Sequence, residues 1–254
     1  MVASFRKICS NCMGLSGNIS IVKDFYGYSS VPAPFTVPSS SYIVPGTLSL
    51  LQQVKLLKQA PLVRLHIKIA VSVDPSVPTI DQMVNAIRLV YGNYGIGVVI
   101  KSTENLNLSD VDIEAGDGGN SSELIQLFNN TNNVGTNEIV VYIVSTVTSG
   151  GDTWNGWSNH PAGKPGVVLA GGLDGASIWT LAHEIGHVLG LLHPELQNFP
   201  KCPKDTNPPS APLQNCLLKR LMTCCSTENI TNLPPDLVQS EVQTMLNSNL
   251  TFTC

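Results

Sequence analysis

Eleven residues, from 183 to 193, carry the side chains best suited to chemistry: His-Glu-Ile-Gly-His-Val-Leu-Gly-Leu-Leu-His. If the segment begins as a helix, His183 and His187 are four residues apart and point in the same direction. Gly190 lets the chain leave the helix in a conformation that other residues resist, so His193 can return toward the first two. Three imidazole nitrogens can bind zinc and leave a fourth position open for water, which is typical of catalytic zinc sites.

Glu184 follows the first of these histidines and can reach a water on the metal without binding the metal itself. Zinc lowers the pKa of such a water to about 7, so that hydroxide is available near neutral pH. Glu184 would take the proton as general base and later give it to the leaving amine as general acid. The pattern predicts hydrolysis of a peptide bond. The alternative is a buried helix that carries histidines by chance, but three of only five histidines in the chain fall within this segment.

The segment resembles the zinc signature of the metzincin metallopeptidases, HExxHxxGxxH, and every fixed position is filled. That family has a methionine turn below the metal, and residues 220–223, Arg-Leu-Met-Thr, are similar to it, which points to Met222. The alternative for Met222 is an ordinary core methionine. Pro194 follows the third histidine as in the serralysin branch, but no tyrosine follows Met222 and no calcium-binding repeats follow the domain. The resemblance is therefore to the clan, with no family assigned within it.

This resemblance implies an α/β fold with a twisted mixed sheet and helices above the cleft. A zinc helix and an irregular C-terminal subdomain closed by a helix complete it. It also implies a zinc endopeptidase with one catalytic Zn²⁺. An edge strand just before the zinc helix would pair with the substrate backbone, a place occupied here by Val167, Val168, Leu169 and Ala170, although a plain edge strand is the alternative. The alternative function is a latent or non-catalytic zinc-binding interaction module of the same fold, which the presence of Glu184 disfavours.

The hydrophobic periodicity agrees with an α/β order. It predicts strands over 62–73, 97–102, 138–145 and 167–170. Helices are predicted over 80–91, 122–128 and 235–246, with the zinc helix over 177–189. In the first strand Arg64, His66 and Lys68 fall on one face. We therefore expect His66 to be an exposed strand residue and not a metal ligand.

The chain divides unevenly into an N-terminal extension or possible prosegment, residues 1–60, and a catalytic domain, residues 61–254. Residues 31–46 are rich in proline and serine, which is typical of an extended connector. Cys9 or Cys12 could occupy the open zinc position of an inactive form, because a thiolate is a competent zinc ligand. A long loop over 149–166 contains Trp154 and Trp157, which could line the cleft or pack the loop onto the core. We favour packing.

The composition, with 43% hydrophobic and 13% charged residues and a net charge of -4, is typical of a folded enzyme. We expect a monomer that acts on a peptide or protein substrate. The sequence has no basic run that would favour nucleic acid, and its apolar runs are too short to span a membrane. Seven cysteines and six N-x-S/T patterns favour an extracellular setting with disulfides. However, residues 1–20 contain no apolar segment typical of a signal peptide, so the localisation stays open.

Overall fold

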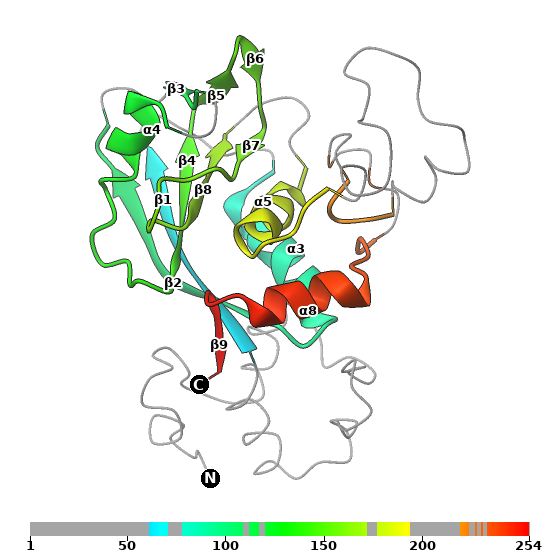
Figure 1. Ribbon diagram of the computed structural model, residues 1–254. Helices are drawn as coiled ribbons and strands as arrows, with labels where there is room; N and C mark the ends of the chain where they lie inside the picture. Colours follow the sequence, from blue (N-terminus) through cyan, green and yellow to red (C-terminus); the bar gives the residue numbers. More distant parts are fainter. Residues whose placement is uncertain are drawn as a thin grey trace, which may run out of the picture.

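A six-stranded mixed sheet forms the centre of the computed structural model (Figure 1). The structure describes residues 61–70, 78–108, 112–116, 120–171, 177–193, 219–223, 227, 230 and 233–253. The strands run in the order β2-β1-β4-β8-β7, with β9 beside β1. The parallel strands are β1 (Pro61–Ala70), β2 (Gly97–Leu106), β4 (Ile139–Val144) and β8 (Gly166–Ala170). The antiparallel strands are β7 (Gly156–Trp157) and β9 (Thr251–Thr253).

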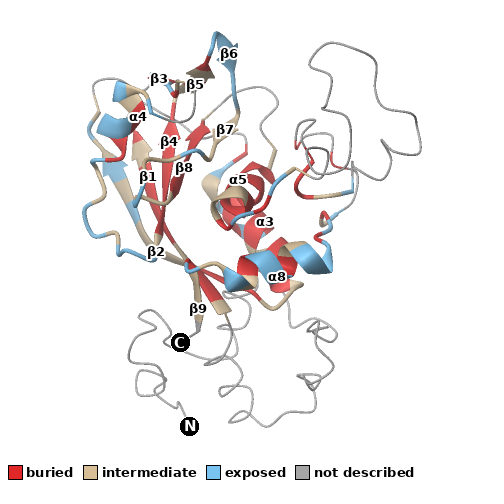
Figure 2. Ribbon diagram, viewed as in Figure 1, coloured by how far each residue is buried: buried red, intermediate tan, exposed pale blue. Residues whose placement is uncertain are grey.

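Helices cover both faces of this sheet. On one face lie α3 (Ile80–Gly92), α5 (Thr180–Val188) and α8 (Gln239–Asn247). On the other lie α4 (Ser122–Leu127) and a small sheet of β3 (Asp112–Glu114), β5 (Thr146–Ser149) and β6 (Asp152–Thr153). The central strand β4 is buried throughout, as Figure 2 shows, because its alternate side chains enter the two cores.

The first face holds α5 in a buried position. The helix α3 begins at a capping box, in which the Thr79 hydroxyl accepts from the backbone of Gln82 and the Gln82 side chain accepts from the backbone of Thr79. Near the end of α3, the Tyr91 hydroxyl donates a hydrogen bond of 2.8 Å to the carbonyl of Ala182 in α5. Both α3 and α5 therefore have a fixed position against the sheet.

The predicted α/β class is confirmed, and the long elements lie close to their predicted ranges. The zinc helix begins later than expected, at Thr180. Helix α8 begins at Gln239, because Asp236 pairs with Arg220 in a β-bridge and is not helical. The strands β3, β5, β6, β7 and β9 were not predicted. These strands have two to four residues each, too few for a periodic pattern.

The expectation that His66 is exposed is wrong. Its side chain contacts Glu138 Oε2 through Nε2 at 2.8 Å and Ser102 Oγ through Nδ1 at 2.9 Å. Lys68 is also buried, and its ammonium donates to Glu104 Oε2 at 2.9 Å and to the carbonyl of Asn132. The three β1 residues do share one face, but partners on β2 and on the segment before β4 cover that face.

Several predictions concern residues that the structure does not describe. The extension 1–60, all seven cysteines and the disulfides expected among them lie outside the described residues. Among the helices that the structure does describe, none has the length and apolar character needed to cross a membrane.

Candidate metal centre

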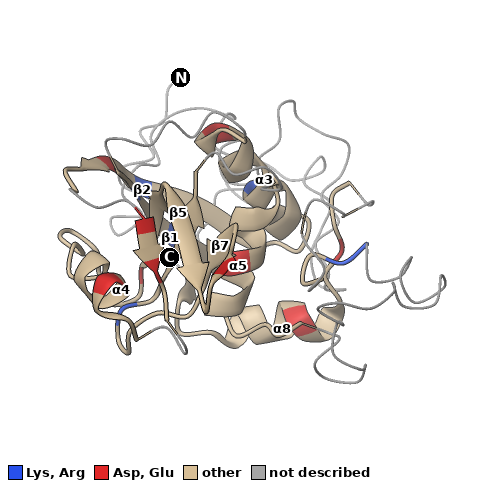
Figure 3. Cartoon of the chain, turned by 90° about the horizontal axis from the view of Figure 1, so that it is seen from above, with Lys and Arg blue, Asp and Glu red and all other residues tan. Residues whose placement is uncertain are grey.

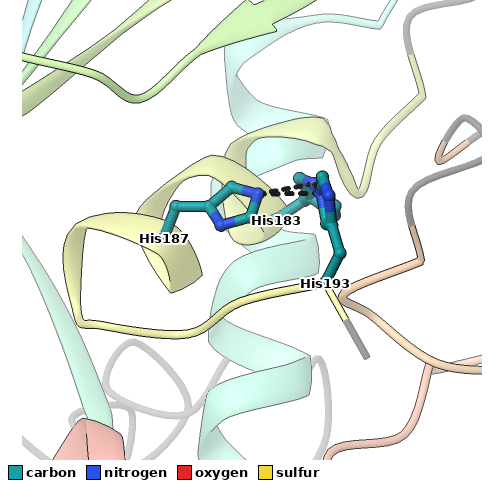
Figure 4. Close-up of side chains that lie close together, drawn as sticks. All are labelled: His183, His187 and His193. Carbon is teal, nitrogen blue, oxygen red and sulfur yellow. Dashed lines mark hydrogen bonds between the residues drawn. The ribbon is translucent and has the colours of Figure 1, made fainter. Parts of the chain in front are cut away.

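The three histidines of the sequence motif come together at the end of α5. His183 and His187 lie on the same side of the helix, four residues apart. The helix ends at Val188, its C-cap is Leu189, and the next residue, Gly190, has a φ of 98°. The amide of Gly190 donates to the carbonyl of His187, and the amide of Leu191 donates to that of Gly186. This is a Schellman motif, and it turns the chain so that His193 faces the other two rings (Figure 4).

The Nε2 atoms of the three rings converge on one point. The distances between them are 3.1 Å for His183–His193, 3.1 Å for His183–His187 and 3.0 Å for His187–His193. Nδ1 of His183 lies 2.8 Å from the carbonyl of Leu221, and Nδ1 of His187 lies 2.9 Å from that of Leu191. Because a carbonyl only accepts, these Nδ1 atoms carry the protons, and both Nε2 atoms of the neutral rings present lone pairs.

Lone pairs that face one another at this distance repel unless a cation lies between them. A tetrahedral zinc ion with ligands at about 2.0–2.1 Å places those ligands about 3.3 Å apart, close to the observed separations. Burial and the neighbouring histidines lower the pKa of His187, and the same causes lower the pKa of His193 to about 3. Neutral imidazoles are the form that binds metal. The donor set therefore fits zinc, and it is the one such group of His, Cys, Asp and Glu within the described ranges.

Glu184 lies in the same cleft and is not part of the nitrogen cluster. It is the acidic residue of α5, a helix that lies beside β7 (Figure 3), and its side chain approaches Gly156 of that strand. Burial raises the pKa of Glu184 above its ordinary value, while His187 and a hydrogen bond from Ser158 act in the opposite direction. A carboxylate in this position can exchange protons with a group in the cleft.

The cleft has a volume of about 420 Å³. Its wall opposite α5 is the segment from Thr153 to Asn159, which includes β7. Thr180, Thr223 and Thr227 also line it, and the hydroxyls of Thr180 and Thr227 are 3.0 Å apart. Sequence reasoning missed these threonines. The position of Thr223 beside Met222 was the available signal, whereas nothing local marked the other two.

The two tryptophans of the loop before β8 lie at this cleft, and packing alone does not describe them. Trp154 is 38% exposed and lines the cleft, with its ring 5.8 Å from that of Trp157 in an edge-to-face arrangement. Trp157 lines the cleft too, but it also packs against the second core with α4. The two tryptophans thus line the cleft, and Trp157 also packs onto the core. The prediction favoured packing alone and is correct only in part.

The expected edge strand is not at the edge of the sheet. Val167, Val168, Leu169 and Ala170 form most of β8, which has β4 on one side and β7 on the other. Gly156 pairs with Leu169, and the carbonyl of Asn155 accepts from the amide of Ala170. The chain before β8 folds back onto it, a non-local pairing that the order of elements did not reveal. The outermost strand beside α5 is therefore β7.

Met222 lies directly beneath α5. It is completely buried in the core that contains α5, and a Cβ added to Gly186 would lie 2.7 Å from its sulfur. The neighbouring Leu221 provides the carbonyl that accepts from His183. The structure therefore brings the Met222 segment to the metal ligands, while any special role of the methionine stays a prediction.

Comparisons with known proteins bear on this site. A sequence profile described as metallo-peptidase family M12 matches residues 76–233, which is more than half of the chain. No curated protein sequence matches significantly. Among solved structures, metalloproteinase-II from Bacteroides fragilis matches with a TM-score of 0.47 and 15% identity, over 74% of this chain and 53% of that chain. Archaemetzincin from Methanopyrus kandleri matches with a TM-score of 0.43 and 16% identity, over 74% and 95%. The chain thus spans about half of the Bacteroides protein.

Proposed function

The chain belongs to metallo-peptidase family M12, and from this premise we propose that it is a zinc-dependent endopeptidase. His183, His187 and His193 would hold one Zn²⁺, and Glu184 would be the general base and general acid. The observation that carries the proposal is the convergence of three Nε2 atoms within 3.0–3.1 Å, with the Glu184 carboxylate in the same cleft.

The residues around the metal position have different roles. A bound zinc ion would supply Lewis acidity toward water and toward the scissile carbonyl. The carbonyls of Leu221 and Leu191 fix the orientation of two histidine rings through their Nδ1 atoms, which keeps both Nε2 atoms directed at one point. The two histidine rings need not reorient when a substrate binds, because both carbonyls belong to buried residues.

Glu184 would move the proton of the reaction. A water oxygen forms a bond with the scissile carbon, and a Glu184 carboxylate oxygen takes the proton that this water loses. When the C–N bond breaks, the same oxygen delivers the proton to the leaving nitrogen. Burial favours this role because it raises the pKa of Glu184, so that the protonated form is less costly.

The substrate would bind as an extended peptide along β7. This strand is the last in the sheet order and lies against α5, so a peptide added there would pass Glu184. Strand addition supplies main-chain hydrogen bonds whatever the peptide sequence. The exposed ring of Trp154 lies at the same wall and offers an apolar contact to a side chain of the peptide. The substrate strand is thus proposed to be β7, and not residues 167–170.

The test is cleavage of a mixed peptide library by the purified parent and by Glu184→Ala, with zinc measured in both. We expect about one zinc per chain in each protein, and at least a 100-fold lower rate in the variant, since general acid–base catalysis contributes about 10²–10⁴-fold. Asp81→Asn, which changes an exposed carboxylate at the start of α3, is the control and should keep full activity.

Internal cleavage of the peptides would support an endopeptidase, whereas removal of terminal residues alone would contradict that part of the proposal. If both proteins hold zinc but neither cleaves any peptide, the proposal fails in favour of a latent or non-catalytic zinc-binding module. If the parent binds no zinc at neutral pH, the metal assignment itself is wrong.

A further inference from the structure

We propose that Gly156 and Ser158 are positioning residues that hold the Glu184 carboxylate in the orientation needed for proton transfer. The inference rests on the proposed peptidase function and extends it to β7. That strand would then act on the reaction itself, in addition to any contact it makes with the substrate.

Gly156 leaves the space that the Glu184 side chain fills. A Cβ added at Gly156 would lie 2.6 Å from Cγ of Glu184, 2.7 Å from Oε1 and 2.8 Å from Cδ, closer than real Cβ contacts allow. Gly156 does not have the positive φ that requires a glycine. Glycine within a strand also weakens it, and it often marks a close approach. The close approach of the Glu184 carboxylate therefore explains why residue 156 is a glycine.

Ser158 lines the same cleft as the Glu184 carboxylate. Residues two apart in an extended chain point to the same side, so Gly156 and Ser158 both face α5. The Ser158 hydroxyl can donate to that carboxylate, and its interaction with Glu184 acts to lower the pKa that burial raises. The residue between them, Trp157, packs against the second core on the opposite side. The alternation of side chains therefore places Gly156, which leaves space, and the Ser158 hydroxyl, a possible donor, beside Glu184.

The backbone on which both residues lie is itself fixed. Gly156 pairs with Leu169 and Trp157 pairs with Val168, so the interior strand β8 sets the position of β7. Glu184 lies on α5, which the core holds from the other side. A glutamate side chain with three rotatable bonds thus meets a rigid wall. The wall should increase the rate of the chemical step and should have little effect on substrate affinity.

The experiment compares Gly156→Ala, Ser158→Ala and Ser158→Thr with the parent, each also combined with Glu184→Ala. We measure kcat and KM on one peptide from the library, zinc content and Tm. Ser158→Ala should lower kcat about tenfold at unchanged KM, as loss of a hydrogen bond to a charged group predicts. Ser158→Thr should recover most of that loss because it keeps the hydroxyl. Neither change should lower kcat further when Glu184 is absent.

Gly156→Ala provides a readout that does not depend on activity. Its Cβ should displace the carboxylate, lowering kcat about 100-fold and Tm by about 2–12 °C through overpacking. With Glu184→Ala the overlap is gone, so the Tm loss should largely disappear. Zinc content should stay at the parent level throughout. The exposed Ser122→Ala in α4 is the control and should match the parent in every measurement.

Four results would overturn the inference. A rise in KM at constant kcat would assign β7 to substrate binding alone. An equal Tm loss with and without Glu184 would mean that the new Cβ meets another group. An active parent whose Ser158 variants keep full kcat would refute the positioning role while leaving the peptidase intact. An inactive parent would remove both the proposed function and this inference.

Discussion

Two methionines of the same core allow the role of the Met222 segment to be separated from packing. Met222 and Met245 are both completely buried, and both belong to the core that contains α5. Met222 lies against Gly186, between the first two metal ligands, whereas Met245 lies on α8. A change at either residue leaves a cavity in one shared core, but only one of the cavities lies beneath the metal ligands.

Met222→Ala and Met245→Ala should each cost about 2–5 kcal/mol of unfolding free energy, the usual cost of a methionine-sized cavity. Only Met222→Ala should also weaken zinc binding, because the segment that accepts from His183 loses its support. Chemical denaturation and zinc titration of both variants would measure this. Met222→Leu, which conserves volume, should cost less than about 1.5 kcal/mol. Equal zinc affinity in the parent, Met222→Ala and Met245→Ala would show that Met222 is an ordinary core residue.

At the scale of elements, β1 has a polar face that neighbouring side chains shield from solvent. Glu138 is in contact with His66, with the amide of Gly135 and with Arg64, the last at 3.6 Å. Burial alone would raise the pKa of Glu138, but the hydrogen bonds from Gly135 and His66 outweigh it and lower the pKa below 4.5. The ionised carboxylate therefore stabilises the folded state.

Glu138→Gln should cost about 1–3 kcal/mol at neutral pH, since it replaces the charged acceptor beside the buried His66. Because the folded pKa is lowered, this stabilisation is present above the ordinary value of 4.5 and is lost as the pH falls below it. The parent should thus lose more stability than the variant on acidification. Urea denaturation at pH 7 and pH 4, with the exposed Asp81→Asn as control, checks this. Parallel loss in parent and variant would contradict the assignment.

The elements that the sequence predicted are those with local patterns. Helix α3 has a capping box and regular apolar spacing, and β4 is a continuous apolar run, so both lie within a residue or two of their predicted ranges. The histidine triad was predictable for the same reason, since its spacing is set by one helix and one glycine turn. The resemblance to metzincins is confirmed at the level of a metallopeptidase family.

What the sequence could not predict depends on contacts between distant segments. The face of β1 that carries His66 follows from alternation, but its burial depends on Glu138, which is 72 residues away. Residues 167–170 looked like an edge strand because the two residues of β7 gave no periodic signal. The threonines at the cleft come from α5 and from two positions after residue 220, and only the fold brings them together.

At the scale of the molecule, the metal centre connects parts of the chain that lie far apart in sequence. His183 and His187 come from α5, and His193 comes from the turn beyond it. The carbonyl that accepts from His183 belongs to Leu221, whose amide donates to Asp236 just before α8. Arg220 also pairs with Glu241 on α8. Any loss of order at the triad should therefore reach the C-terminal helix.

Removal of zinc should lower the stability of the described fold as a whole. Without the cation, the Nε2 lone pairs of His183 and His187 repel, and the turn that carries His193 loses its link to α5. A ligand at about 1,000 times its Kd stabilises by about 4 kcal/mol, which for a chain of this size corresponds to about 8–16 °C in Tm. Chelation by EDTA, followed by calorimetry, should give this shift, and added zinc should reverse it.

Glu184→Ala should show the same shift, because Glu184 is not a ligand. His193→Ala should have a low Tm that EDTA barely changes. A parent protein whose Tm does not respond to EDTA, although its zinc has been removed, would show that the metal serves the reaction alone and adds nothing to the fold.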